Sequence, residues 1–248
     1  MTSDDCIVVP TTLVWCHSKP VITLAKVNIK YLKLPFWDQT LAHATDIVGL
    51  VSLDDIKIPS DLERSLGGFI YHMWRCGSTL VARLLNEVND SVALSEPFIF
   101  QQLLDTQQGT ANQRIIWLRK LMALHCIAFK HKEKLSIKWS GLMALYAHEI
   151  HKAFPSIPAL FLHRDPIEVL VSIRDRPLGN FKLMSAWHLN IDEQLYQQMT
   201  RLEQVAFLIS CLCESLLQLE LLHILCKHSA NPIIDKHLTL AILQNYQK

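Results

Sequence analysis

The chain has 248 residues, of which 50% are apolar and 19% are charged, a balance typical of a globular protein with a sizeable core. Its formal net charge of +1 provides no strong field for duplex nucleic acid or an anionic membrane surface, so any anion site has to be local. The seven cysteines are odd in number and scattered, which argues against a secreted disulfide framework and predicts reduced thiols in a cytoplasmic protein.

Residues 1–60 form the first predicted unit. Short β-like runs at Ile7–Val9, Leu13–Trp15 and Val21–Lys26 precede an irregular segment at Leu34–Asp38 that contains proline and tryptophan. We expect this unit to be an N-terminal extension packed on a main domain that takes residues 61–248.

From Gly67 onward, short apolar strands alternate with longer helical stretches. Strands are predicted at Phe69–His72, Ser91–Leu94, Leu135–Trp139, Ala159–His163 and Pro232–Asp235. Helices are predicted at Ser78–Val88, Asn112–Lys130, Leu142–Phe154, Pro166–Ile173 and roughly Glu193–His228. This alternation predicts an α/β protein with a parallel sheet of about five strands flanked by helices. Ligands of such sheets bind at the carboxyl ends of the strands, so the residues that follow the strands are the candidates for function.

The most apolar stretch, Val205–Cys226, is interpreted as a buried helix. Glu214 and Glu220 interrupt it, and its uncharged runs are far shorter than the roughly 20 residues that span a bilayer. Cys211 and Cys213 do not form a metal site, because residues two apart do not share a helix face. We therefore expect neither a membrane span nor a bound metal.

The first candidate site follows the strand that ends at His72. A loop with Arg75 and Gly77 leads into a helix opened by Ser78 and Thr79. A helix N-terminus offers free backbone N–H groups, and glycine lets the backbone approach a ligand closely, so these residues can form an anion cradle. Ser78 stands where a nucleoside triphosphatase loop has its lysine, which argues against a kinase. The alternative is an ordinary strand–turn–helix capped by a hydroxyl side chain.

A second candidate anion site follows the strand Ala159–His163. Arg164 stands at the end of this strand, and Ser172 lies eight residues later, two turns into the next helix. A guanidinium with a hydroxyl donor suits a doubly charged phosphate. The alternative is that Arg164 forms a surface ion pair and Ser172 is merely a polar helix residue.

The candidate general base is Glu96, which ends the second predicted strand and precedes Pro97. Lys138 ends the third predicted strand and is the candidate cation for transferred charge. The alternatives are an exposed loop carboxylate and a lysine extended from a strand edge.

Three histidines, His72, His163 and His188, are alternative bases, and of these His188 is favoured. Arg174 and Arg176 either support the second anion site or are exposed to solvent.

The segment Trp74–Leu80, W-R-C-G-S-T-L, resembles the 5′-phosphosulfate loop of sulfotransferases that depend on 3′-phosphoadenylyl sulfate (PAPS), including bacterial and tyrosylprotein sulfotransferases. Arg164 with Ser172 resembles the 3′-phosphate signature of that family. The resemblance implies a P-loop-type three-layer fold and PAPS as co-substrate without a metal. It also implies sulfuryl transfer to a hydroxyl or amine of a small-molecule, saccharide or peptide acceptor.

The same resemblance assigns roles to individual residues. The implied cofactor-binding residues are Arg75, Cys76, Gly77, Ser78, Thr79, Arg164 and Ser172. The implied catalytic residues are Glu96, Lys138 and Arg75.

Three expectations remain open. The family continues past its last strand with a tyrosine-containing element, which Pro232–Leu238 lacks, so we expect a shortened C-terminal part and reduced cofactor affinity. A non-catalytic nucleotide-binding protein of the same fold is the main alternative function, and a kinase is less favoured. Acceptor specificity is expected in Phe98–Thr110 and Leu178–Gln198.

Overall fold

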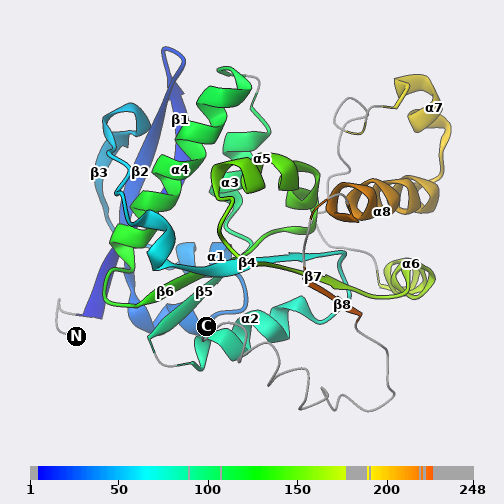
Figure 1. Ribbon diagram of the computed structural model, residues 1–248, viewed down its shortest axis with the longest axis horizontal. Coiled ribbons are helices and arrows are strands. Elements are labelled where there is room, and N and C mark those ends of the chain that lie inside the picture. Colours follow the sequence, from blue (N-terminus) through cyan, green and yellow to red (C-terminus); the bar gives the residue numbers. More distant parts are fainter. Residues whose placement is uncertain are drawn as a thin grey trace.

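The structure is a computed structural model that describes residues 5–88, 90–106, 108–176, 189, 191–217, 219 and 222–225 (Figure 1). It contains an antiparallel sheet of three strands in the order β1-β2-β3 and a sheet of five strands in the order β5-β6-β4-β7-β8. All four neighbouring strand pairs of the larger sheet are parallel. The predicted α/β class, with a parallel sheet flanked by helices, is therefore confirmed.

The smaller sheet consists of β1 (Cys6–Cys16), β2 (Lys19–Asn28) and β3 (Ile47–Ser52). The strands of the larger sheet are β4 (Leu66–His72), β5 (Ser91–Ser95), β6 (Lys134–Lys138), β7 (Ala159–His163) and β8 (Leu222–Leu225). The α-helices are α1 (Trp37–Leu41), α2 (Ser78–Asn86), α3 (Phe98–Leu104), α4 (Ala111–Ala128), α5 (Ala147–Ala153), α6 (Pro166–Asp175), α7 (Glu193–Gln198) and α8 (Arg201–Leu217). Short 3-10 helices are η2 (Ile29–Lys33), η3 (Leu53–Asp55), η4 (Leu62–Ser65) and η5 (Gly141–Tyr146).

β1 and β2 form one long hairpin, although two separate runs were predicted along β1. Its turn residues His17 and Ser18 have φ values of 48° and 62°, the left-handed conformation that suits tight hairpins. Pro10 is accommodated beside a register shift in an edge strand, where its missing N–H is tolerated. The hairpin packs against α4 through the edge-to-face rings of Trp15 and Trp117, whose centroids lie 5.5 Å apart.

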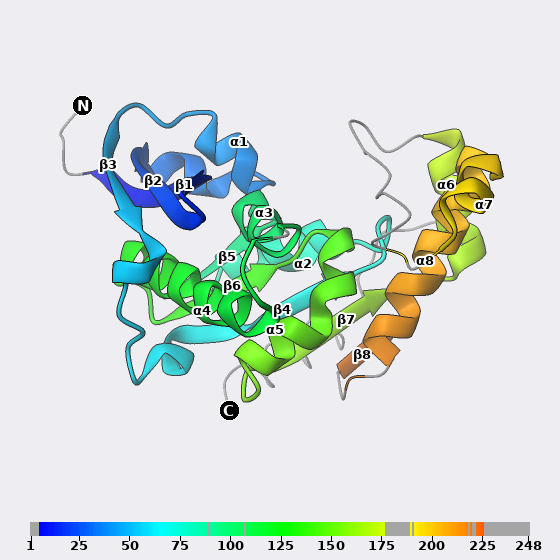
Figure 2. The ribbon, with the colours of Figure 1, turned by 90° about the horizontal axis from the view of Figure 1, so that it is seen from above.

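Helices cover both faces of the parallel sheet, with α2 on one face and α3, α4 and α5 on the other (Figures 1 and 2). Successive residues of β4 serve opposite faces, as the two-residue period of a strand requires. Phe69 and Tyr71 join the larger core, which also holds Trp139, whereas Ile70 joins a smaller core under α2 with Leu162. The continuous apolar run of β4 is thus explained by burial on both faces.

The chain order through the sheet has a direct consequence for the site. From the central strand β4 the chain passes to β5 and β6 on one side and then crosses to β7 on the other. Such a change of direction opens a crevice beyond the carboxyl ends of the strands. Here that point lies after His72, where the predicted anion loop begins.

The predicted long helix Glu193–His228 was wrong. α7 ends at Gln198, and a new helix begins because Thr200 and Glu203 form a reciprocal cap: the Glu203 N–H donates to Thr200 Oγ1 at 3.3 Å, and the Thr200 N–H donates to Glu203 Oε2 at 2.7 Å. β8 then pairs with β7 and supplies a fifth strand earlier than predicted. A short apolar run such as Leu222–Leu225 fits helix and strand equally well by periodicity. The predicted strand Pro232–Asp235 lies outside the described residues.

Two smaller differences concern segments next to the site. α3 occupies part of Phe98–Thr110, the segment where acceptor specificity was expected, and the predicted helix Leu142–Phe154 is divided between η5 and α5. Within the described part of the chain, no helix is both long enough and apolar enough to cross a bilayer.

Candidate functional site

The loop between β4 and α2 has an unusual backbone. Trp74 and Arg75 have φ values of 44° and 49°, and Gly77, the N-cap of α2, has a φ of 83°. Left-handed conformations are costly for residues with a Cβ and tend to persist at ligand-binding turns that their surroundings hold in place. Gly77 provides no side-chain cap for α2, so no capping side chain covers the backbone N–H groups of the first turn. The loop therefore has the backbone features of an anion cradle.

Trp74 fixes this loop against the end of β6. Its indole lies on Gly141, where an added Cβ would come within 2.6 Å of the ring. On the other side, the Trp74 backbone N–H donates to His72 Nδ1 at 3.2 Å. In its neutral form His72 therefore carries its proton on Nε2, an assignment that follows from this hydrogen bond. Burial and the charge of Lys138 would lower the pKa of His72, but its contacts with Cys76 and Glu96 outweigh them and raise it.

Arg75 and Arg164 follow two different strands, and the structure brings them together. Arg164 Nη1 donates to the Arg75 carbonyl at 3.2 Å, and the Arg164 backbone N–H donates to Met73 Sδ at 3.4 Å. Arg75 Nη2 in turn donates to the carbonyl of Arg176, at the C-cap of α6, at 2.6 Å. The two candidate anion sites are thus one interlocked unit beyond β4 and β7.

The side chains of this unit differ in exposure. Arg75 is exposed, whereas only 13% of the Arg164 side chain is exposed. Ser78 is buried at the start of α2, and Thr79 beside it is half-buried. Ser172 is half-buried on α6, two turns after Arg164. Guanidinium groups bonded to backbone carbonyls keep their full positive charge, so this edge of the molecule is suited to an anion.

Glu96 and Lys138 form a second group on the other side of β4. β5 and β6 pair so that Ser95 lies opposite Lys138, and the Glu96 N–H donates to the Lys138 carbonyl at 2.7 Å. Lys138 is fully buried, and its Nζ forms an ion pair with Glu96 Oε1. His72 Nε2 lies 3.4 Å from the same carboxylate oxygen. Glu96 itself has a φ of 57°, a strained conformation that turns its side chain back toward this group.

The environment of Glu96 decides its charge. Burial alone would raise its pKa, but the contact with His72 and the charge of Lys138 outweigh burial and lower the pKa to about 2. Glu96 is therefore ionised at neutral pH, and in this state its proton affinity is low.

Phe36 and Asp38, from the N-terminal part of the chain, contribute to this group, which the sequence did not predict. The Phe36 ring lies over Lys138 Nζ, with the centroid 5.3 Å away. The pKa of Asp38 is raised, first by partial burial and then by the nearby charge of Glu96, against the opposing effect of the Phe98 backbone N–H. Nothing in the spacing of Leu34–Asp38 could have indicated these contacts, because they depend on how the extension folds back.

The other predicted residues have these positions. Cys76 is buried in the smaller core beside α2, and His163 is half-buried at the end of β7. Arg174 Nε donates to Asp175 Oδ1 at 2.8 Å, so it is engaged outside the Arg75–Arg164 unit. His188 and most of Leu178–Gln198 lie outside the described residues.

Glu168, which was not predicted from the sequence, contacts Arg164. Its position four residues after Arg164 was the signal that could have identified it.

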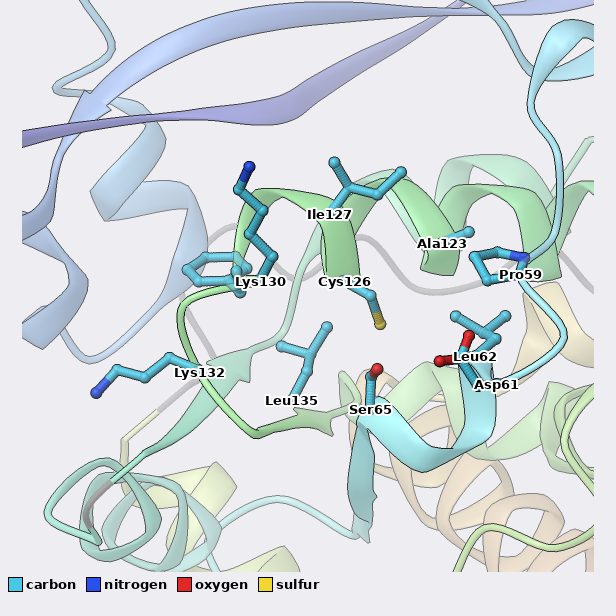
Figure 3. A pocket seen from close by; sticks show the side chains of 11 residues that line it. Pro59, Asp61, Leu62, Ser65, Ala123, Cys126, Ile127, Lys130, Lys132 and Leu135 are labelled. Carbon is cyan, nitrogen blue, oxygen red and sulfur yellow. The ribbon is translucent and has the colours of Figure 1, made fainter.

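Two hollows lie away from the strand ends. One, of about 200 Å³, lies between the C-terminal end of α4 and the start of β6; Cys126 points into it, and Lys130 and Lys132 stand at its rim (Figure 3). This volume is below the range of about 300–1,000 Å³ that ligand pockets usually occupy. The other, of about 620 Å³, lies beside Ser18 and Trp117 at the outer end of the hairpin. Neither contains a residue of the two groups described above.

Comparison with known proteins adds no assignment: no protein-family model matches this sequence, and no curated protein matches it significantly.

Proposed function

We propose that the protein is a PAPS-dependent sulfotransferase with a P-loop-type three-layer fold, which transfers a sulfuryl group to an acceptor hydroxyl or amine. The observation that carries the proposal is the contact between Arg75 and Arg164. These two arginines follow different strands, yet Arg164 bonds the backbone of the loop that holds Arg75. A ligand with anionic groups at both ends needs two adjacent cationic sites of this kind.

Within this proposal, the loop and the N-terminus of α2 bind the 5′-phosphosulfate. Arg75 lies at this end, and Ser78 and Thr79 add hydroxyl donors. Arg164 and Ser172 bind the 3′-phosphate, one at the start of α6 and one on its second turn. The strand order supports the same placement, because the two groups follow β4 and β7, the neighbouring strands at which the chain changes direction across the sheet.

The chemical step requires the ion pair of Glu96 and Lys138 to open. Lys138 Nζ moves to the sulfuryl and bridging oxygens, where negative charge develops, and leaves the Glu96 carboxylate in contact with His72. Without Lys138 the pKa of Glu96 rises, and the carboxylate accepts the proton of the acceptor as the acceptor oxygen or nitrogen attacks sulfur. The bond between sulfur and the 5′-phosphate oxygen breaks, and adenosine 3′,5′-bisphosphate leaves. Phe36 and Asp38 lie beside this pair, so we place acceptor entry there.

A non-catalytic nucleotide-binding protein is the second candidate, and one observation favours it. Glu96 is engaged by both Lys138 and His72, and its low pKa makes it a weak base as long as those contacts persist. A closed pair of this kind also serves as a purely structural link between β5 and β6.

Isothermal titration with adenosine 3′,5′-bisphosphate tests the nucleotide site. We expect binding without Mg²⁺, and Arg164→Ala should weaken it about 10- to 100-fold, as expected for the loss of charge-assisted hydrogen bonds. Arg83→Ala, at an exposed position late in α2, is the matched control and should leave affinity unchanged. Binding of ATP with Mg²⁺ but not of the bisphosphate would refute the proposal.

Transfer of labelled sulfate from PAPS to phenol, saccharide, peptide and lipid pools separates the two candidates. The enzyme should label at least one pool, and Glu96→Gln should abolish labelling while bisphosphate binding persists. Binding without transfer to any pool would favour the non-catalytic protein.

A further inference from the structure

We propose that Glu168 is a specificity-determining residue of the nucleotide site, which competes with the ligand for Arg164 and so weakens the binding of those ligands that carry a phosphate at that end. The inference rests on the proposed function and names a residue that the family resemblance does not supply. Arg164 Nε donates to Glu168 Oε2 at 2.6 Å. The same guanidinium uses Nη1 on the Arg75 carbonyl. Arg164 is therefore already engaged on two sides before any ligand arrives.

The position of Glu168 follows from helix geometry. Glu168 and Ser172 are four residues apart and share a face of α6, while Arg164 precedes the N-cap residue Asp165 and Arg176 is the C-cap, so the two arginines flank the helix. The loop of Arg75 spans this face: its carbonyl accepts from Arg164 at one end, and its guanidinium donates to the Arg176 carbonyl at the other. Glu168 thus lies between the two residues that the proposal assigns to the 3′-phosphate, Arg164 and Ser172.

The negative charge of Glu168 affects how a phosphate binds to Arg164. A phosphate that binds Arg164 has to displace the Glu168 carboxylate, because two anions cannot share the same guanidinium edge without repulsion. Glu168 is 45% exposed, and an exposed i, i+4 ion pair is weak, so a doubly charged phosphate with bidentate bonds can displace it. A ligand that lacks this phosphate has nothing to place there and leaves the ion pair intact.

An orienting role and a competing role of Glu168 therefore predict opposite changes in ligand affinity when its charge is removed. If its carboxylate served only to orient Arg164, removing the charge would weaken ligand binding. If it competes, removing the charge strengthens the binding of ligands with the 3′-phosphate and leaves other ligands nearly unchanged.

The test is isothermal titration of wild type and Glu168→Gln with adenosine 3′,5′-bisphosphate and adenosine 5′-monophosphate. We expect Glu168→Gln to tighten bisphosphate binding about three- to ten-fold, in line with the loss of one weak competing pair plus its repulsion, and to change monophosphate binding less than about two-fold. Glu87→Gln is the control: it removes the same charge from an exposed residue at the C-cap of α2, the far end from the loop. Thermal melts of both variants check that each is folded.

The outcomes separate the inference from the proposed function. If wild type binds neither nucleotide, the proposed function fails and the inference fails with it. If wild type binds the bisphosphate but Glu168→Gln binds it equally or more weakly, competition by Glu168 is refuted and the proposed function stands. If Glu87→Gln tightened bisphosphate binding as much as Glu168→Gln does, the increase in affinity would follow from the change in net charge alone. That result would also refute the specific role of Glu168.

Discussion

The two charged groups beside β4 differ in how their charges are satisfied. Glu96 and Lys138 form a closed group: the lysine is fully buried, and the carboxylate meets both the ammonium and His72. Arg75 and Arg164 form an open group, whose guanidiniums bond backbone carbonyls and the exposed carboxylate of Glu168. In a group of the first kind, removal of one charge leaves the other buried without its ion-pair partner, whereas groups of the second kind can exchange partners with a ligand.

The difference also assigns the two groups to different steps of the proposed reaction. The open group can bind an anion with little rearrangement beyond displacement of Glu168. The closed group has to open before Glu96 can accept a proton. The proposed enzyme thus separates binding, at the Arg75–Arg164 side, from chemistry, at the Glu96–Lys138 side.

Removal of the buried ammonium should have the largest effect on stability. Lys138→Met keeps a long side chain but removes the buried ion-pair partner of Glu96, so we expect the free energy of unfolding to fall by about 3 kcal/mol. Urea unfolding measures this loss. The double variant Glu96→Gln with Lys138→Met should recover most of it, because no charge is then left unpaired. A loss below about 1 kcal/mol in the single variant would mean that the ion pair with Glu96 contributes little to stability.

Acidification should open the same group reversibly. The folded pKa of Glu96 is about 2 against an ordinary value of 4.5, so its contribution to stability is present above about pH 4.5 and is lost as the pH falls toward 2. We expect this group to account for a loss on the order of 2 kcal/mol in that window. Urea unfolding of wild type and Glu96→Gln at a series of pH values measures this loss. The free energy of unfolding should fall more steeply with decreasing pH in wild type than in the variant. If the free energy of unfolding fell equally with pH in both proteins, Glu96 would not be the titrating group.

The smallest effect is expected in the open group, at Gly77. Its φ of 83° is strained for any residue with a Cβ, but nothing lies within 4 Å of an added Cβ, so Gly77→Ala changes conformation and not packing. We expect a loss of about 1 kcal/mol in stability and weaker bisphosphate binding. Gly49→Ala is the control, because its Cβ also meets open space and its φ lies outside the strained range. If both variants behave alike, the conformation of the anion loop does not depend on Gly77.

Local sequence signals predicted the frame of the site well. The alternation of apolar runs and helices placed β4, β5, β6 and β7 with small errors at their ends, because burial on both faces requires continuous apolar strands. The same signals placed Arg75, Glu96 and Arg164 after strands and Lys138 at the end of one, and all four lie at the carboxyl edge of the sheet.

The sequence failed where a tertiary contact decided the outcome. The helix predicted through His228 missed the Thr200 cap and β8, since a short apolar run has no distinctive period. The contact of Phe36 with Lys138 joins residues that are remote in sequence, and no local pattern encodes such a pairing.

What the sequence alone determined, then, is which residues end the strands, because strand ends follow from the pattern of apolar and turn-forming residues. Only the tertiary structure decided which of them meet: the order β5-β6-β4-β7 divides them into the pair of Glu96 with Lys138 and the pair of Arg75 with Arg164. The physical reason is that strand order is set by long-range packing, which a two-residue or four-residue period does not record.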